Sequence, residues 1–65
     1  MSWDQVEGNW TAFKGKLREQ WGDLTDDELE QLKGKRDQLV GKIQEKYGSE
    51  KARIERELDD LAANL

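Results

Sequence analysis

The sequence predicts an all-α fold, a small irregular bundle of three helices in a single domain that covers residues 1–65. Apolar residues recur every three or four positions, as on one face of a helix, and do not alternate as they would in a strand. The segments between the expected helices are only a few residues long, so neighbouring helices should run roughly antiparallel. A chain of 65 residues buries only roughly 60% of its unfolded surface, so we expect a thin core.

A first helix is expected over about residues 3–21. Ser2 and Gln5 form a capping-box pattern at its start, and Gly22 is placed to end it as a left-handed residue after the last turn. With Trp3 as the first position of a heptad, the inward positions are Trp3, Val6, Trp10, Phe13, Leu17 and Leu24.

A second helix is expected over about residues 26–47. Thr25 caps it, Glu28 closes a capping box, and Leu24 can contact Leu29 across the start. Its inward positions are Leu29, Leu32, Leu39, Val40, Ile43 and Tyr47.

The two ends of this second helix are also marked. Acidic residues occupy its first turn, Lys42 and Lys46 its last, and both suit the helix dipole, while Gly48 is placed as the stop. Arg36 interrupts the apolar stripe next to Gly34. A break near residues 34–36, which would give four helices in all, is therefore the alternative.

A third helix is expected over about residues 50–63, with Ser49 as its cap. Its inward positions are Ile54, Leu58, Leu61 and Leu65. Opposite charges four residues apart predict surface ion pairs along it, namely Lys51/Glu55, Arg53/Glu57 and Arg56/Asp60.

The six glycines form two sets with steps of seven residues, and the second set is the first shifted by 26: Gly8, Gly15, Gly22, then Gly34, Gly41, Gly48. Gly22 and Gly48 are explained as helix stops. Each interior glycine costs a helix about 0.8–1 kcal/mol relative to alanine. Two interpretations stay open: a surface where another helix or a partner approaches closely, or a loosely folded set of helices. The candidate contact surface comprises Gly8, Gly15, Gly34 and Gly41.

A small basic cluster is the second candidate surface: Lys14, Lys16 and Arg18 lie on the first expected helix together with Trp10 and Trp21. Such a cluster could contact phosphates and stack on bases. Acidic residues at positions 4, 7 and 19 leave this helix nearly neutral, which favours solvated lysines and core tryptophans instead. Nucleic acid or an anionic surface is thus the alternative partner and not the favoured one.

The sequence offers no catalytic site. It contains no cysteine and no histidine, so the usual nucleophiles, bases and zinc ligands are missing, and we expect no metal, no cofactor and no enzyme activity. The adjacent acids Asp26/Asp27 and Asp59/Asp60 diverge by about 100° on a helix, as suits capping and solvation. No export signal and no membrane-spanning apolar run is found, so a cytoplasmic location is expected.

Two segments resemble the CsbD-like family of small bacterial stress-response proteins. The first contains Asn9-Trp10, Phe13-Lys14-Gly15-Lys16 and Glu19-Gln20-Trp21-Gly22-Asp23-Leu24-Thr25-Asp26-Asp27. The second is Gly34-Lys35-Arg36-Asp37-Gln38-Leu39-Val40-Gly41-Lys42-Ile43-Gln44-Glu45-Lys46-Tyr47-Gly48. Together they span about residues 8–50, and the tail from Ser49 matches only in helical, charged character.

The resemblance implies a small, irregular helical bundle in the cytoplasm, induced by general stress or in stationary phase. It brings no catalytic or ligand-binding residues with it. We therefore expect a non-enzymatic, abundant and soluble stress-response protein that shields or binds other macromolecules. The alternative is a module that binds anionic surfaces or nucleic acid through Lys14, Lys16 and Arg18. The sequence specifies neither a macromolecular partner nor an oligomeric state.

Overall fold

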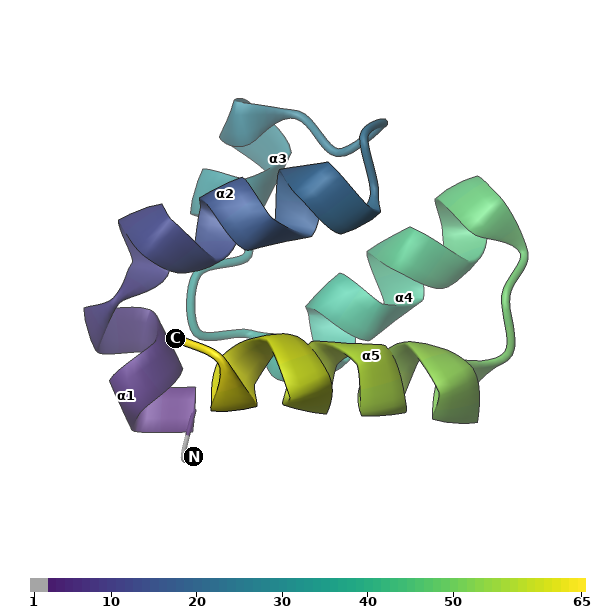
Figure 1. The fold of residues 1–65 in the computed structure, drawn as a ribbon. Helices are drawn as coiled ribbons and strands as arrows, with labels where there is room; N and C mark the ends of the chain where they lie inside the picture. Colours follow the sequence, from purple (N-terminus) through teal and green to yellow (C-terminus); the bar gives the residue numbers. More distant parts are fainter. Residues whose placement is uncertain (1–2) are drawn as a thin grey trace.

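A computed structural model describes residues 3–65, and these residues form helices and no strand (Figure 1). The helices are α1 (Trp3–Gly8), α2 (Trp10–Gln20), α3 (Asp26–Gln31), α4 (Arg36–Tyr47) and α5 (Lys51–Ala63). The all-α class is confirmed. The described residues form five helices, however, more than the three or four expected.

The first expected helix divides at Asn9, a break that the sequence pattern does not predict. The Asn9 side-chain amide and its backbone N–H both donate to the Gln5 carbonyl oxygen, at 2.9 and 3.1 Å. A side chain that bonds the backbone in this way competes with helix continuation, and Gly8 just before it is a poor helix former. Asn9 leaves helical geometry at ψ 32° and becomes the residue that precedes α2.

The second expected helix divides at Gly34, as the alternative with a break near residues 34–36 supposed. Gly34 has φ 74°, a left-handed conformation that L side chains rarely adopt, and Lys35 then precedes α4. The residues before α2 and α4, numbers 9 and 35, are 26 apart. The two halves of the internal repeat therefore have a helix break at equivalent positions.

The predicted left-handed stop at Gly48 is confirmed, and the one at Gly22 is wrong. Gly48 ends α4 with φ 68°, and its N–H donates to the Gln44 carbonyl oxygen at 2.8 Å. Gly22 is not left-handed, because α2 already ends at Gln20, where the chain turns to bury Trp21.

The predicted caps of the first and third expected helices have different outcomes. Glu50, in extended geometry, precedes α5 without a side-chain cap, so Ser49 is not the cap. The predicted cap at Ser2 lies outside the described residues.

The buried side chains are apolar and come from all five helices and their connections. They are Val6, Trp10, Phe13, Leu17, Trp21, Leu24, Leu29, Leu32, Leu39, Val40, Ile43, Ile54, Leu58 and Ala62. Trp3, Leu61 and Leu65 pack against this core and are partly buried. The heptad positions therefore predicted most of the core. Tyr47 is 39% exposed, however, and the buried Trp21 and Ala62 were not among the predicted inward positions.

Helix α5 lies along one edge of the bundle in Figure 1, where it packs against α4 and α2, and α1 packs on α2. α4 and α5 run in roughly opposite directions, as the short connection between them predicts. Arg36 at the start of α4 joins the two helices, with its guanidinium 3.1 Å from Glu55 and 3.4 Å from Asp59. Within α5, Arg53 pairs with Glu57 as expected.

Candidate functional site

The four glycines of the candidate contact surface lie in two kinds of place. Gly15 and Gly41 are exposed in the middle of α2 and α4, and a Cβ at either position would meet no heavy atom within 4 Å. Gly34 lies in the α3–α4 turn, where a Cβ would lie 2.8 Å from a carboxylate oxygen of Glu7. Gly34 is therefore a turn glycine, not the helix-interior glycine that was expected.

Gly8 lies at the end of α1, also with open space around its Cα. A shallow hollow of about 470 Å³ at this junction is lined from α1, from the first turn of α2 and by Lys33 of the α3–α4 turn. Together with the contact between Glu7 and Gly34, this brings Gly8 and Gly34 to the same end of the molecule. Gly15 and Gly41 remain as open helical surface on separate helices.

Of the three residues in the basic cluster, Lys14 is engaged in ion pairs between α2 and α3. The Lys14 ammonium lies 2.9 Å from Asp26 Oδ1 and 2.5 Å from Glu30 Oε1. These hydrogen bonds, the one to Glu30 first and the one to Asp26 second, raise the pKa of Lys14 above its ordinary value. Lys14 therefore joins two helices. Within residues 3–65, Lys16 and Arg18 take part in no ion pair.

The tryptophans expected beside this cluster belong to the core. Trp10 and Trp21 are only 3% and 4% exposed, and the Trp10 indole N–H donates to the Leu29 carbonyl oxygen at 3.0 Å. Buried rings are not placed to stack on bases. The arrangement thus argues against a nucleic-acid surface built from Lys14, Lys16, Arg18 and these aromatics.

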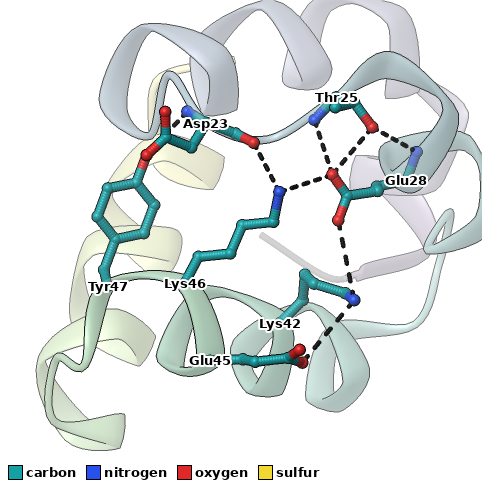
Figure 2. Close-up of polar contacts among 7 residues, drawn as sticks. All are labelled: Asp23, Thr25, Glu28, Lys42, Glu45, Lys46 and Tyr47. Carbon is teal, nitrogen blue, oxygen red and sulfur yellow. Dashed lines mark hydrogen bonds and ion pairs between the residues drawn. The ribbon is translucent and has the colours of Figure 1, made fainter.

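The most elaborate polar cluster of the described chain lies where α3 begins (Figure 2). The Thr25 hydroxyl accepts from the Glu28 backbone N–H at 3.2 Å, and Glu28 Oε1 accepts from the Thr25 N–H at 3.2 Å and from its hydroxyl at 2.9 Å. The capping box that the sequence predicts is therefore confirmed. It satisfies backbone N–H groups that the first turn of a helix leaves without partners.

The last turns of α4 close over this cluster. Lys46 Nζ donates to Glu28 Oε1 and to the Asp23 carbonyl oxygen, both at 2.7 Å, and Lys42 Nζ lies 3.8 Å from Glu28 Oε2. The Tyr47 hydroxyl accepts from the Asp23 N–H at 2.8 Å. Figure 2 shows these side chains reaching from α4 across to the connection that leads into α3. They fix the last turns of α4 to the start of α3 and to the connection that precedes it.

From the sequence, Lys42 and Lys46 are expected only to suit the helix dipole, and Tyr47 is expected in the core. No motif links Glu28 to Lys46, because the two residues are 18 positions apart and meet only through helix packing. The 26-residue repeat contains the nearest sequence signal for the role of Tyr47. It aligns Tyr47 with Trp21, and a tyrosine at an otherwise buried position needs a polar partner for its hydroxyl.

The pKa of Glu28 carries a testable prediction. The hydrogen bond from Lys46, followed by those from Thr25, lowers the pKa of Glu28 from its ordinary 4.5 to about 2. A carboxyl whose pKa is lower in the folded state adds stability above pH 4.5 and loses it as the pH falls toward 2. Glu28→Gln should therefore be less stable than the parent protein at pH 7, with a difference that narrows below pH 4.5. Urea midpoints across a pH series measure it.

The matched control is Glu45→Gln, which removes an exposed carboxylate lying 3.8 Å from Lys42. Its urea midpoint should stay close to that of the parent protein at every pH. A Glu28→Gln difference that stayed constant from pH 7 to pH 2 would contradict the ionic role of Glu28.

These clusters stabilise structure and lack the features of a catalytic site. General acid–base chemistry needs a pKa near the working pH, and Glu28 is held far below it. Across residues 3–65, no group of three histidine, cysteine, aspartate or glutamate side chains lies close enough to hold a metal ion. In the same part of the chain, no helix has the length and apolar character needed to cross a bilayer.

Fold and site together define a small, charge-rich helical protein whose polar groups serve helix ends and helix contacts. Residues 4–56 match the family described as CsbD-like, so the chain belongs to the CsbD-like family. The match confirms the resemblance seen over residues 8–50 and extends it into α5.

Several bacterial relatives are highly similar. The UPF0337 protein YjbJ of Escherichia coli O6:H1 is 59% identical over 59 residues, which cover 91% of this chain and 86% of the relative. The UPF0337 protein ECA0631 of Pectobacterium atrosepticum is 62% identical over 58 residues, covering 89% and 84%. The UPF0337 protein NE2439 of Nitrosomonas europaea is 55% identical over 62 residues, covering 95% and 66%. No solved structure gives a significant match.

Proposed function

We propose that this protein is a non-enzymatic, cytoplasmic stress-response protein that acts as an abundant, soluble shield for other macromolecules. Membership of the CsbD-like family supports the stress role. The observation that carries the shielding role is the distribution of charge. The chain has 11 basic and 15 acidic residues, whereas every buried side chain in the described part is apolar.

Such a surface has a direct physical consequence. Charged groups hold water strongly, and a net charge of −4 opposes association with other acidic proteins. Tyr47 is the one large apolar side chain of residues 3–65 that is exposed, so the surface offers little for a partly unfolded protein to stick to. At high concentration, copies of this protein lie between client molecules and keep the exposed apolar patches of the clients apart.

The test uses citrate synthase warmed until it aggregates. Light scattering and recovered activity should show protection that grows steadily with the molar excess of this protein. Because the action is separation and not capture, size-exclusion chromatography should show no stable complex with the client. Absence of protection at any excess would overturn the proposal.

A variant with fewer charges but the same net charge tests the physical cause. Lys16→Gln and Arg18→Gln with Glu19→Gln and Glu50→Gln remove two charges of each sign from residues that make no ion pair within residues 3–65. Protection per milligram should fall. If this variant, or the same mass of serum albumin, protected citrate synthase equally well, the protection would be explained by crowding alone. Crowding favours compact states by only about 0.2–1 kcal/mol.

A further inference from the structure

The outer face of α5 is a charged surface on which only Arg53 and Asp59 take part in ion pairs within residues 3–65. Its inward side is formed by Ile54, Leu58, Leu61 and Ala62. At about 100° per residue, the opposite side collects six exposed residues. They are Ala52, Arg53, Arg56, Asp59, Asp60 and Ala63. A shallow hollow of about 340 Å³ lies on this face, lined by charged residues of α5 alone.

The charges on this face are segregated along the helix. Basic residues occupy its amino-terminal half and Asp59 and Asp60 its carboxyl-terminal half. This order opposes the helix dipole, which prefers acids at the start of a helix and bases at its end. Apart from the Arg53–Glu57 pair, the arrangement therefore does not serve the stability of α5 itself.

Two of the charges also lack the partner that the sequence predicted. Arg56 and Asp60 have the i,i+4 spacing of an ion pair, yet neither takes part in one within residues 3–65. Their neighbours do: Arg53 pairs with Glu57 at 3.3 Å, and Asp59 lies 3.4 Å from Arg36. Arg56 and Asp60 thus remain available for a contact outside the chain.

We propose that this face binds the same face of a second copy of the chain in antiparallel orientation. A twofold axis at the level of Leu58 places residue 56 of one copy opposite residue 60 of the other, because each lies two positions from residue 58. Arg56 then faces Asp60 twice in the pair. Residue 53 comes opposite Ala63, whose small side chain lets the helices approach closely. The contact is isologous, as in most protein dimers.

The size of the face sets the strength of this association. A helix of 13 residues is about 20 Å long, and one such face buries much less than the roughly 800 Å² per partner of a standard interface. The net charge of −4 adds repulsion at long range. The dimer should therefore form in the high-micromolar to millimolar range, with charge complementarity giving it specificity and orientation.

The decisive experiment is a charge swap between two single variants. Arg56→Asp leaves two carboxylates opposed in each contact of a homodimer, and Asp60→Arg leaves two guanidinium groups opposed. Each variant alone should lose association at least tenfold. An equimolar mixture should recover it, because every contact between the two variants again joins opposite charges. The double variant Arg56→Asp/Asp60→Arg should also recover association, now between two identical chains.

Sedimentation velocity and NMR amide shifts, both followed over concentration, measure the association. Arg18→Asp and Glu19→Arg on α2 are the controls, since they make the same changes in net charge elsewhere and should leave association unchanged. Equal melting temperatures show that the variants fold. The proposal fails if the parent protein stays monomeric to millimolar concentration, if the single variants associate as the parent does, or if the mixture does not recover association.

Discussion

Phe13→Ala is expected to remove much of the protein's stability and to lower its urea midpoint steeply. Phe13 is fully buried in α2, with its ring edge-on to Trp3 at a centroid distance of 5.5 Å and tilted against Trp10 at 5.6 Å. Truncating a buried phenylalanine to alanine costs about 3–5 kcal/mol. At 0.05–0.15 kcal/mol per residue, a 65-residue domain has a total stability of roughly 3–10 kcal/mol. One core residue can therefore account for much of it.

Far-UV circular dichroism and urea unfolding measure this loss. Phe13→Leu should fall between the parent protein and Phe13→Ala, because it keeps most of the buried volume. Thr11→Ala, at an exposed position of the same helix, should unfold close to the parent protein. A Phe13→Ala protein with a cooperative urea transition at nearly the midpoint of the parent would show that the thin core is not what holds the helices together.

The core could be predicted from the sequence because burial leaves a periodic pattern. The spacing of Val6, Trp10 and Phe13 is the same whether one helix continues through Asn9 or two helices meet there. The stripe therefore identified the inward residues but not the break between α1 and α2. A single side-chain hydrogen bond from Asn9 to the Gln5 carbonyl marks that break, and periodicity does not register it.

The local polar contacts were predictable and the distant ones were not. The Thr25–Glu28 capping box joins residues three positions apart, and the chain itself brings them together. Glu28 and Lys46 are 18 positions apart, and Arg36 and Glu55 are 19 apart. Their pairing depends on the packing angles of helices, which the sequence pattern does not specify. Glu55 shows the consequence, since it pairs with Arg36 and not with the predicted Lys51.

The internal repeat predicts equivalent geometry but not equivalent environments. Asn9 and Lys35 precede α2 and α4 at the 26-residue offset of the glycines. Trp21 and Tyr47, also 26 apart, differ: the indole is buried, whereas the phenol hydroxyl accepts from the Asp23 N–H at the surface. Equivalent positions therefore hold a buried aromatic residue in the first half and a hydrogen-bonded surface residue in the second.

Gly15→Ala combined with Gly41→Ala is expected to stabilise the protein by about 2 kcal/mol and to raise its melting temperature by roughly 8–16 °C. Both glycines lie in helix interiors with open space where a Cβ would be added, so alanine brings its helix propensity without a clash. Differential scanning calorimetry measures the rise. Gly34→Ala is the contrasting change: with φ 74° and the Glu7 carboxylate 2.8 Å from the added Cβ, it should lower the melting temperature.

The same double variant separates the two interpretations of the interior glycines. If loosened helices are what the protein needs, the stabilised variant should protect citrate synthase less well while its surface charge is unchanged. If bare backbone on α2 and α4 is a contact surface, the double variant should instead lose binding to a specific partner and still protect citrate synthase as well as the parent does. A double variant no more stable than the parent would mean that solvent-exposed glycine costs these helices nothing. The 26-residue glycine repeat would then need an explanation other than either of these.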